Sequence, residues 1–457
     1  MRTPAFLLAA ALVSGCYRSH EREPARDAAV IDAHSPDAGL DAGDAGPPEP
    51  DADAGPPEPD AGPGPCTTEC EVPQLIASVS FSDSLLEPWA VLDVAPLDGS
   101  LVALVSAGDL TLTGVGTRID YRLLHVPLVS GAPRFEAHAD LWTNQAFMAG
   151  SVRRLGAGYR VVALRADPDY VTEPQDVVVV IATWARAGAE PDVAFVPLRE
   201  EPIPGCTRCY RHGGAVVQDA EHAVAAVAGD GELYVARIAF ADRSVERWTI
   251  AIPDASPDAP AWGASDGFGR ALLTAGGAIS EYRGSYEGAA FALQLSDRSP
   301  RDVIEVPGDR YDPPPRAVFF PDRAELVRFA FGADATTGVI RRWIADTSEL
   351  MEQPPIETGA GLPPLAITSS GGTLVWAEVD LALPGAAILR ALGHAPQCTS
   401  EAPITAAHLP SPLADLDPRV IAAAEHDGRT YVLVLEHLAH QYRAAVLDLG
   451  RCLATRR

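Results

Sequence analysis

The stretch PRAVFFPDRAELVRFAFGADATTGVIRRWIADTS (315–348) contains three short apolar runs, and each run ends in a turn with an acidic residue. These acidic residues are Asp322, Asp334 and Asp346. The runs have the length of strands, are rich in Val, Ile and Phe, and lack the periodicity and caps of a helix. The stretch therefore predicts three consecutive β-strands.

The same three-strand unit recurs along the rest of the chain. First strands are expected at 89–99, near 144–152, and at 214–222, 259–267, 315–324, 364–372 and 418–428. Second strands are expected at 100–108, 159–167, 223–229, 270–277, 325–334, 373–380 and 430–437. Third strands are expected at 121–131, 192–200, 233–243, 290–299, 339–348, 387–393 and 444–451. These are seven units, spaced roughly forty to sixty residues apart, which indicates a repeat architecture.

The repeat predicts an all-β fold, a β-propeller of seven blades over residues 66–457, with six or eight blades as alternatives. A four-stranded blade has two apolar faces and buries both only when it packs between neighbours around a ring. The expected strands are continuously apolar, which is typical of strands that are buried on both faces.

The two ends of this folded part predict how the ring closes. After the last third strand only CLATRR (452–457) remains, which is too short for a fourth strand. Before the first unit lies a surplus strand, QLIASVSF (74–81). We expect this N-terminal strand to complete the last blade.

The unit at 315–331 resembles the WD40-like repeats of TolB-type propellers, in which an aromatic-Ser-Pro-Asp-Gly turn precedes an apolar strand. Phe320-Pro321-Asp322 matches this pattern, and Ser265-Asp266-Gly267 and Asp427-Gly428 match it in part. The resemblance extends over most of 72–452. It implies the propeller fold and says little about partners.

The first sixteen residues, MRTPAFLLAAALVSGC, have the features of a secretory signal: Arg2 and a short apolar segment. Val13-Ser14-Gly15-Cys16 resembles a bacterial lipobox, which implies cleavage before Cys16 and lipid attachment to its thiol. An ordinary secretory signal that ends at a cysteine is the alternative. Because Tyr17 rather than Asp follows the cysteine, the resemblance implies an outer-membrane location, on the periplasmic or the cell-surface face.

Residues 17–65 predict a disordered tether that separates the membrane from the folded part. Asp, Ala, Gly, Pro and Glu dominate it, and residues 27–65 contain no Lys or Arg. Such a segment cannot bury enough apolar surface to repay the entropy of ordering. Its prolines and like charges favour an extended chain, at most ~150 Å long at ~3.1 Å per residue. A calcium site at 51–55 is the alternative, but the acidic loop of a calcium-binding hand is absent.

Six cysteines follow Cys16, and in an exported chain an even number predicts disulfides. We expect Cys206–Cys209 as a local loop, Cys70–Cys452 as a lock on ring closure, and Cys66–Cys398 as the remaining bridge. The rival pairing is Cys66–Cys70 with Cys398–Cys452. At 206–212, zinc would need a ligand beyond Cys206, Cys209 and His212, and a redox pair would need a helix start.

The charge and the remaining motifs narrow the function. The net charge is −27, and residues 66–457 carry 31 Arg against 50 acidic side chains, which opposes nucleic-acid binding. A G-x-S-x-G match at 263–267 is followed by a strand, not by the helix of a nucleophile elbow. The histidines at 426, 437 and 440, with Glu436, are expected in an exposed loop and not as a metal site.

We therefore predict a lipid-anchored, non-catalytic envelope protein whose propeller binds a protein or polysaccharide partner and needs no metal or cofactor. Membrane attachment is expected only through the lipid at Cys16. A propeller enzyme that acts on glycans or peptides is one alternative, and a structural component of an envelope complex is another. The loops at 309–316 and 199–206 are the first candidates for binding segments.

Overall fold

The structure is a computed structural model, and all residues that it describes belong to one compact unit, Ala61–Arg457. The described residues are 66–71, 74–81, 87–108, 119–128, 134–136, 149–166, 177–200, 214–229, 232–251, 261–265, 270–275, 288–294, 301–306, 316–319, 324–331, 338–344, 351–357, 366–370, 373–379, 387–393, 405–408, 420–438 and 441–456. The signal peptide, Cys16, the tether, Cys206, Cys209 and Cys398 lie outside these ranges. No helix of the described residues is long and apolar enough to cross a membrane.

The described elements are β-strands, which confirms the all-β prediction. They form seven four-stranded antiparallel sheets and one two-stranded sheet. The innermost strands are β3 (Glu87–Leu97), β7 (Gly150–Leu155), β11 (Ala215–Gln218), β15 (Ala261–Ser265), β19 (Arg316–Phe319), β23 (Ala366–Ser370) and β27 (Val420–His426). The second strands are β4 (Ser100–Gly108), β8 (Gly158–Ala166), β12 (His222–Gly229), β16 (Arg270–Ala275), β20 (Ala324–Phe331), β24 (Thr373–Val379) and β28 (Arg429–Leu438).

The outer half of each sheet follows in the same order. The third strands are β5 (Ile119–Pro127), β9 (Val177–Trp184), β13 (Glu232–Ala239), β17 (Gly288–Gln294), β21 (Gly338–Ile344), β25 (Ala387–Gly393) and β29 (Gln441–Asp448). The outermost strands are β6 (Arg134–Glu136), β10 (Asp192–Pro197), β14 (Val245–Ala251), β18 (Arg301–Val306), β22 (Met351–Glu357), β26 (Thr405–His408) and β2 (Gln74–Phe81).

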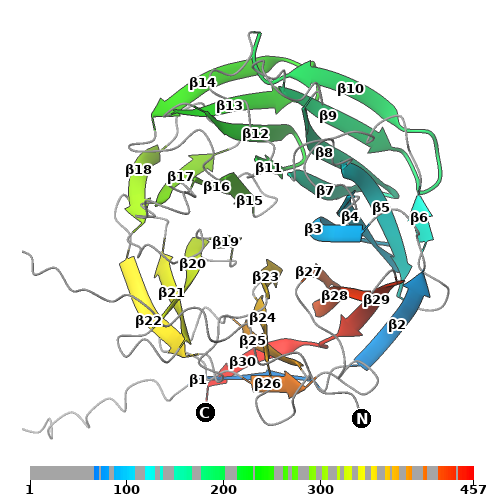
Figure 1. Cartoon of the computed structure of the whole chain (residues 1–457), viewed down its shortest axis with the longest axis vertical. Helices are drawn as coiled ribbons and strands as arrows, with labels where there is room; N and C mark the ends of the chain where they lie inside the picture. Colours follow the sequence, from blue (N-terminus) through cyan, green and yellow to red (C-terminus); the bar gives the residue numbers. More distant parts are fainter. Residues whose placement is uncertain are drawn as a thin grey trace, which may run out of the picture. The chain divides into compact units, whose positions relative to one another are not determined.

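The sheets follow one another around a ring (Figure 1). Each innermost strand contacts the innermost strand of the next sheet, and β27 of the last sheet contacts β3 of the first. This cyclic order of sheets, each radiating outward from its innermost strand, is the arrangement of a β-propeller.

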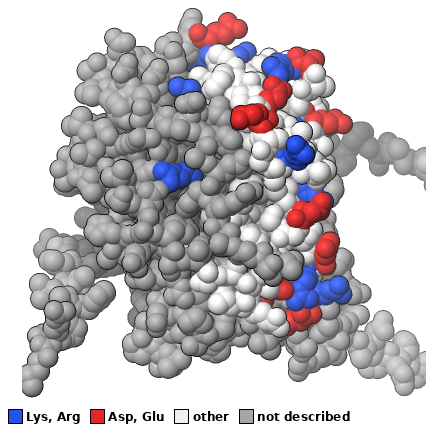
Figure 2. All heavy atoms as spheres, turned by 90° about the vertical axis from the view of Figure 1, so that its right-hand side faces the viewer, with Lys and Arg blue, Asp and Glu red and all other residues white. Residues whose placement is uncertain are grey.

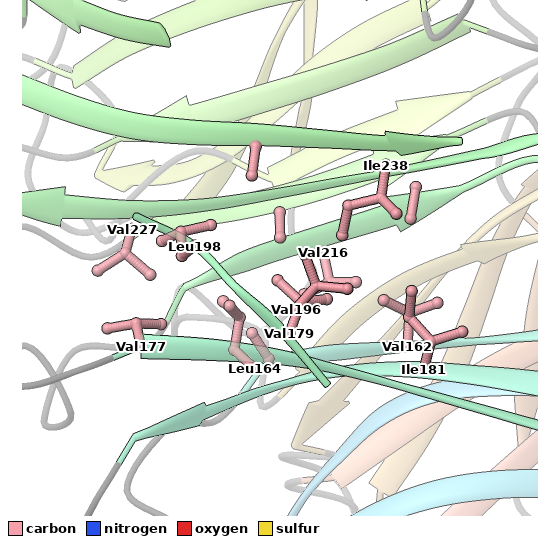
Figure 3. Packing of buried hydrophobic residues seen from close by; sticks show 14 of the residues in the cluster. Val162, Leu164, Val177, Val179, Ile181, Val196, Leu198, Val216, Val227 and Ile238 are labelled. Carbon is pink, nitrogen blue, oxygen red and sulfur yellow. The ribbon is translucent and has the colours of Figure 1, made fainter. Parts of the chain in front are cut away.

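The core lies between adjacent sheets, as the sequence predicts for strands that are apolar on both faces. Along β12, Ala223, Ala225 and Val227 belong to a cluster shared with the second sheet. Figure 3 shows this cluster, with Val227 labelled. The alternate residues Val224 and Ala226 point into a separate cluster shared with the fourth sheet. Since successive side chains of a strand point to opposite faces, one apolar run fills two interfaces.

The ends of the chain pair as expected in one respect and differ in another. β2 pairs with β29 and completes the last sheet, which confirms the predicted role of residues 74–81. The segment after β29, expected to be too short for a strand of that sheet, forms β30 (Cys452–Arg456). β30 pairs with β1 (Cys66–Cys70) in a separate two-stranded sheet, because β1 supplies the backbone partners that the completed sheet no longer offers.

The second unit corrects the sequence interpretation. We expected its third strand at 192–200, but β9 (Val177–Trp184) is the third strand and β10 (Asp192–Pro197) is the fourth. The apolar run of β9 follows Pro174 and Asp176 and is a strand signal like the others, but this unit contains one more run than the three-strand pattern, which assigns the last run as the third strand. The first strand of the unit is β7, which begins at Gly150, at the end of the expected range.

Candidate functional site

A pocket of about 590 Å³ opens at the outer side of the second and third sheets. Its lining consists of Arg199, Glu200, Tyr234, Val235, Arg247, Trp248 and Thr249. The first two follow the end of β10, the next two belong to β13, and the last three belong to β14.

The register of β13 and β14 decides which side chains share a face. Tyr234 lies opposite Thr249, and Val235 lies opposite Trp248. Tyr234 belongs to the apolar cluster shared with the second sheet, whereas Trp248 packs against the cluster shared with the fourth sheet. The pocket lining therefore comes from both faces of the hairpin, around its outer edge.

Arg247 ties the hairpin to the second sheet. Its Nε donates to the carbonyl oxygen of Leu198 at 3.1 Å, and its Nη2 donates to that of Pro197 at 2.9 Å. Both acceptors are neutral backbone groups, so these bonds hold the guanidinium in place without neutralising its charge.

Arg199 provides a second guanidinium at the pocket. Its Cζ lies 4.8 Å from the centre of the Tyr234 ring, a cation–π contact. Its Nη1 is buried and has no acceptor, and the same holds for Nε1 of Trp248. Within the described part of the chain, no carboxylate forms an ion pair with Arg199 or Arg247. The pocket thus holds two positive charges, with Glu200 exposed beside them.

Polar side chains of the innermost strands connect neighbouring sheets. Asp93 on β3 accepts hydrogen bonds from Ser151 Oγ at 2.9 Å and from the backbone N–H of Val152 at 2.7 Å, both on β7. The N–H of Val94 donates to its other oxygen at 2.8 Å. Burial raises the pKa of Asp93 to about 6, although these three hydrogen bonds act in the opposite direction.

A buried arginine makes the next connection. Arg160 on β8 donates to Gln218 Oε1 at 2.9 Å and to the carbonyl oxygen of Asp219 at 2.6 Å, and its Cζ lies 3.2 Å from the ring centre of Phe240. Burial, together with the nearby charge of Arg153, lowers the pKa of Arg160 to about 10. The guanidinium remains charged at neutral pH and acts as a link between the second and third sheets.

Ser265, the serine of the G-x-S-x-G match, is the last residue of β15. Its Oγ donates to the carbonyl oxygen of Gln218 on the neighbouring sheet at 3.0 Å. The next element is strand β16, so the serine ends a strand that is followed by another strand, and it does not lie at a strand-to-helix elbow.

The structure describes only some of the other predicted site residues. Arg199 and Glu200 are the described part of the 199–206 segment, and they do line the pocket. The segment 309–316 lies outside the described residues except for Arg316 at the start of β19. His426 lies in β27 and the Glu436-His437 pair lies in β28, so the expected loop is wrong there, because an extended apolar strand continues through it. Among the described side chains, no group of three or more potential metal ligands forms.

Sequence reasoning missed the hairpin residues of the pocket. Arg247 and Trp248 are adjacent in VERWTIA (245–251), an edge strand that no motif marks. A charged and an aromatic residue side by side on an outermost strand was the available signal. Nothing in the sequence relates this strand to Arg199, since the connection depends on how two sheets pack.

These observations define the class of the protein, a β-propeller. No protein-family model and no curated protein matches the sequence. Among solved structures, the β-propeller domain of the trilobed protease from Pyrococcus furiosus is 10% identical with a TM-score of 0.43, over 80% of this chain and 98% of that one. An α-L-arabinanase from Penicillium chrysogenum is 12% identical with a TM-score of 0.42, over 84% of this chain and 100% of that one.

A sialidase from Trypanosoma rangeli is 8% identical with a TM-score of 0.40. The match covers 83% of this chain but only 59% of the sialidase. At such low identities the likeness concerns the fold alone, and the activities of these proteins do not transfer to this chain.

Proposed function

We propose that this protein is a lipid-anchored, non-catalytic component of the bacterial outer membrane whose propeller binds a protein or polysaccharide partner. The observation that carries the proposal is the pocket of about 590 Å³ with two unneutralised arginines and two aromatic residues. A pocket of this size, with apolar surface and a few polar groups, has the usual form of a ligand site. Arg199 and Glu200 of the predicted binding segment 199–206 belong to its lining.

The anchor and the blade number form part of the same proposal. Cys16 carries the lipid, and residues 17–65 hold the propeller away from the membrane. Each of the seven four-stranded sheets is one blade, which the cyclic contacts between innermost strands support. Residues 320–323, which include the Pro-Asp pair of the TolB-type resemblance, fall between β19 and β20, where the repeat requires a turn.

Site-specific photo-crosslinking on intact cells tests the binding role. A photoreactive residue replaces Glu200 at the pocket, and in a matched control it replaces Glu190, which is exposed at the opposite end of the same sheet. We expect an adduct from position 200 that position 190 does not give. Mass spectrometry of the adduct then identifies the partner as protein or glycan.

The result also separates this proposal from a structural role. A fixed envelope complex should give adducts of constant stoichiometry from several faces of the propeller, including position 190. Equal adducts from both positions would support the structural alternative, and no adduct from either would contradict a partner at this pocket.

An enzyme acting on glycans or peptides is the second candidate, and Asp93 is the observation that favours it. A carboxyl group with a pKa of about 6 can act as a general acid or base near neutral pH. Its hydrogen bonds to Ser151 and Val152 indicate instead a link between two sheets. We expect the purified full chain to hydrolyse no glycan or peptide, and turnover that Asp93→Asn abolishes would establish the enzyme.

The disulfides remain a proposal that the backbone supports. Cys70 lies directly opposite Cys452 in the β1–β30 pair. Opposite residues in antiparallel strands have Cα atoms about 4.5–5.5 Å apart, within the range of a disulfide. In the rival pairing, Cys66 and Cys70 would have to bridge the length of one strand, about 13 Å at ~3.3 Å per residue, which exceeds that range.

The other two bridges follow from this arrangement. The β1–β30 sheet contacts β25 and β26, the strands on either side of Cys398 in the sequence, which favours Cys66–Cys398. Cys206–Cys209 is then the third bridge. Peptide mapping of the unreduced chain tests all three, and a Cys66–Cys70 peptide would contradict them.

A further inference from the structure

We propose that the pocket between the end of β10 and the β13–β14 hairpin binds a sugar residue that carries a carboxylate, that is, a uronic acid of an acidic polysaccharide. The inference rests on the proposed function, because it names the ligand chemistry of the same pocket. It concerns one sugar residue and its immediate neighbours, the part of a polysaccharide that a pocket of about 590 Å³ can enclose.

The two arginines of the pocket are the reason to expect a carboxylate on the ligand. The guanidinium of Arg247 is held in place by the carbonyl oxygens of Leu198 and Pro197, and that of Arg199 lies over the ring of Tyr234. All these partners are neutral, so both positive charges remain uncompensated in the pocket. A guanidinium keeps its charge at physiological pH, and its planar set of N–H donors matches the two oxygens of a carboxylate.

The charge of the whole folded part makes this local arrangement selective. With 31 Arg against 50 acidic side chains, its long-range field repels densely charged polyanions, so the proposed polysaccharide is one whose uronic acids are widely spaced. On the side of the molecule drawn in Figure 2, acidic and basic side chains intermingle over the part that the structure describes. Fields of exposed charges are screened beyond about 8–10 Å, whereas a carboxylate inside the pocket meets the arginines at contact distance.

The other lining residues are the reason to expect that the carboxylate belongs to a sugar. Glu200 and Thr249 are exposed at the pocket and offer acceptors for hydroxyl groups. A uronic acid has several ring hydroxyl donors, the nearest on the carbon next to the one that bears the carboxylate, so it can satisfy Glu200 and the arginines together. Tyr234 is buried beneath Arg199, and Trp248 lies on the opposite face of the hairpin, so the carboxylate and hydroxyl contacts carry the recognition of the sugar.

Calorimetric titration of the purified full chain tests the inference with two matched pairs of disaccharides. Glucuronosyl-glucose is compared with glucosyl-glucose, and galacturonosyl-galactose with galactosyl-galactose, each pair with one linkage. The members of a pair differ only in a carboxylate against a hydroxymethyl group. We expect at least one acidic disaccharide to bind about tenfold more tightly than its neutral counterpart, the lower limit for a charge-assisted hydrogen bond.

Two variants assign the effect to the pocket. Arg199→Gln should remove the preference for the acidic disaccharide. Arg243→Gln is the matched control, since Arg243 is exposed in the turn at the opposite end of the same hairpin, where it pairs with Asp192. It should bind as the unchanged protein does. The thermal unfolding midpoint of both variants shows whether each remains folded.

Each contrary result has its own consequence. If the acidic and neutral disaccharides bind equally, and Arg199→Gln does not change this, the pocket does not recognise a carboxylate. The proposal that it binds a polysaccharide would still hold. Failure of all four sugars to bind at about 10 mM, ten times a Kd of about 1 mM, would overturn the inference itself. If the sugars do not bind but position 200 gives a protein adduct, the proposed function still holds, with a protein as the partner. If position 200 gives no adduct either, the proposed function is contradicted as well.

Discussion

Asp93 shows at the scale of one residue how the propeller joins its sheets. Its carboxylate receives three hydrogen bonds, two of which come from β7 of the neighbouring sheet. Ala423 on β27 makes a comparable connection, because its N–H donates to Thr368 Oγ1 on β23 at 3.2 Å. Short polar side chains on innermost strands thus satisfy backbone groups across sheet boundaries. At Asp93 this link has a cost, since burial disfavours the ionised form.

The raised pKa of Asp93 predicts a pH dependence of stability. Between about pH 4 and pH 6 the folded protein holds a proton on Asp93 that the unfolded chain releases, so the free energy of unfolding falls as the pH rises. A shift from 3.8 to about 6 corresponds to about 3 kcal/mol, at about 1.4 kcal/mol per pKa unit. In the Asp93→Asn variant the side chain cannot ionise, so its free energy of unfolding should not show this fall between about pH 4 and pH 6. Denaturant titrations across this pH range measure both proteins, and parallel curves would contradict the prediction.

Gly450 is a residue whose backbone and surroundings both require glycine. Its φ is +70°, and a Cβ at this position would fall against the Cβ and the carboxylate of Glu71. Glu71 in turn pairs with Arg429 at 3.0 Å, and Arg429 also binds Asp448 at 2.9 Å. The close approach therefore belongs to the contact between the two ends of the folded part.

Gly450→Ala should lower the free energy of unfolding by about 2–4 kcal/mol, from left-handed backbone strain together with the clash. Gly156→Ala is the control, because Gly156 has a φ of +59° but open space around it. For Gly156→Ala the free energy of unfolding should fall only by the cost of the left-handed backbone, about 1–2 kcal/mol. Denaturant titration of both variants measures the difference, and equal losses would mean that Glu71 moves aside without cost.

At the scale of an element, β21 carries two adjacent arginines with opposite surroundings. Arg342 donates to both oxygens of Glu325 at 2.9 Å, and the two side chains are 4% and 0% exposed. Arg341 points to the other face and pairs with Glu352 on the outermost strand β22, whose side chain is 54% exposed. One strand therefore provides a buried and an exposed ion pair within the same sheet.

Arg342→Met should lower the free energy of unfolding by about 3–5 kcal/mol, because the buried Glu325 carboxylate loses the two hydrogen bonds and the positive charge of Arg342. Arg341→Met should cost about 0–1 kcal/mol, since water solvates Glu352 in place of the lost partner. Thermal or denaturant unfolding of the two variants provides the comparison. Equal losses of stability in the two variants would contradict the prediction.

For the whole molecule, the ends of the chain meet in two neighbouring sheets. β2 completes the last sheet, and β1 pairs with β30 in the two-stranded sheet that contacts β25 and β26. The chain therefore closes through hydrogen bonds between its first and last strands, with the expected Cys70–Cys452 bridge at the same place. A bridge between residues so far apart in sequence restricts the unfolded chain most strongly.

Replacing Cys70 and Cys452 together by Ser should lower the free energy of unfolding by about 4 kcal/mol, within the range for long disulfide loops. The matched variant with Cys206 and Cys209 both replaced by Ser should lose less, because that loop is short. Unfolding of both variants with and without reductant tests this. A loss in the first variant that persists equally under reducing conditions would show that the bridge is not its cause.

Much of the architecture could be predicted from the sequence because it depends on local patterns. The apolar runs between turn residues located nearly every inner strand, and the surplus strand at 74–81 identified the partner of β29. The prediction failed at β9, because a pattern of three strands does not tell which of four apolar runs in a unit is the third. The segment 452–457 does not supply the fourth strand of the last sheet, as predicted, but its pairing with β1 could not be predicted, because the partner of a terminal strand is not a local property.

The sequence by itself determined the all-β fold, the repeating unit and the segment 199–206 as a candidate binding region, since each depends on neighbouring residues. Only the tertiary structure decided that Arg199 lies beside Tyr234, Arg247 and Trp248. Sheet register and the packing of one sheet on the next bring these residues together across some fifty positions of sequence. The pKa of Asp93 depends on packing for the same reason, because burial between two sheets raises it.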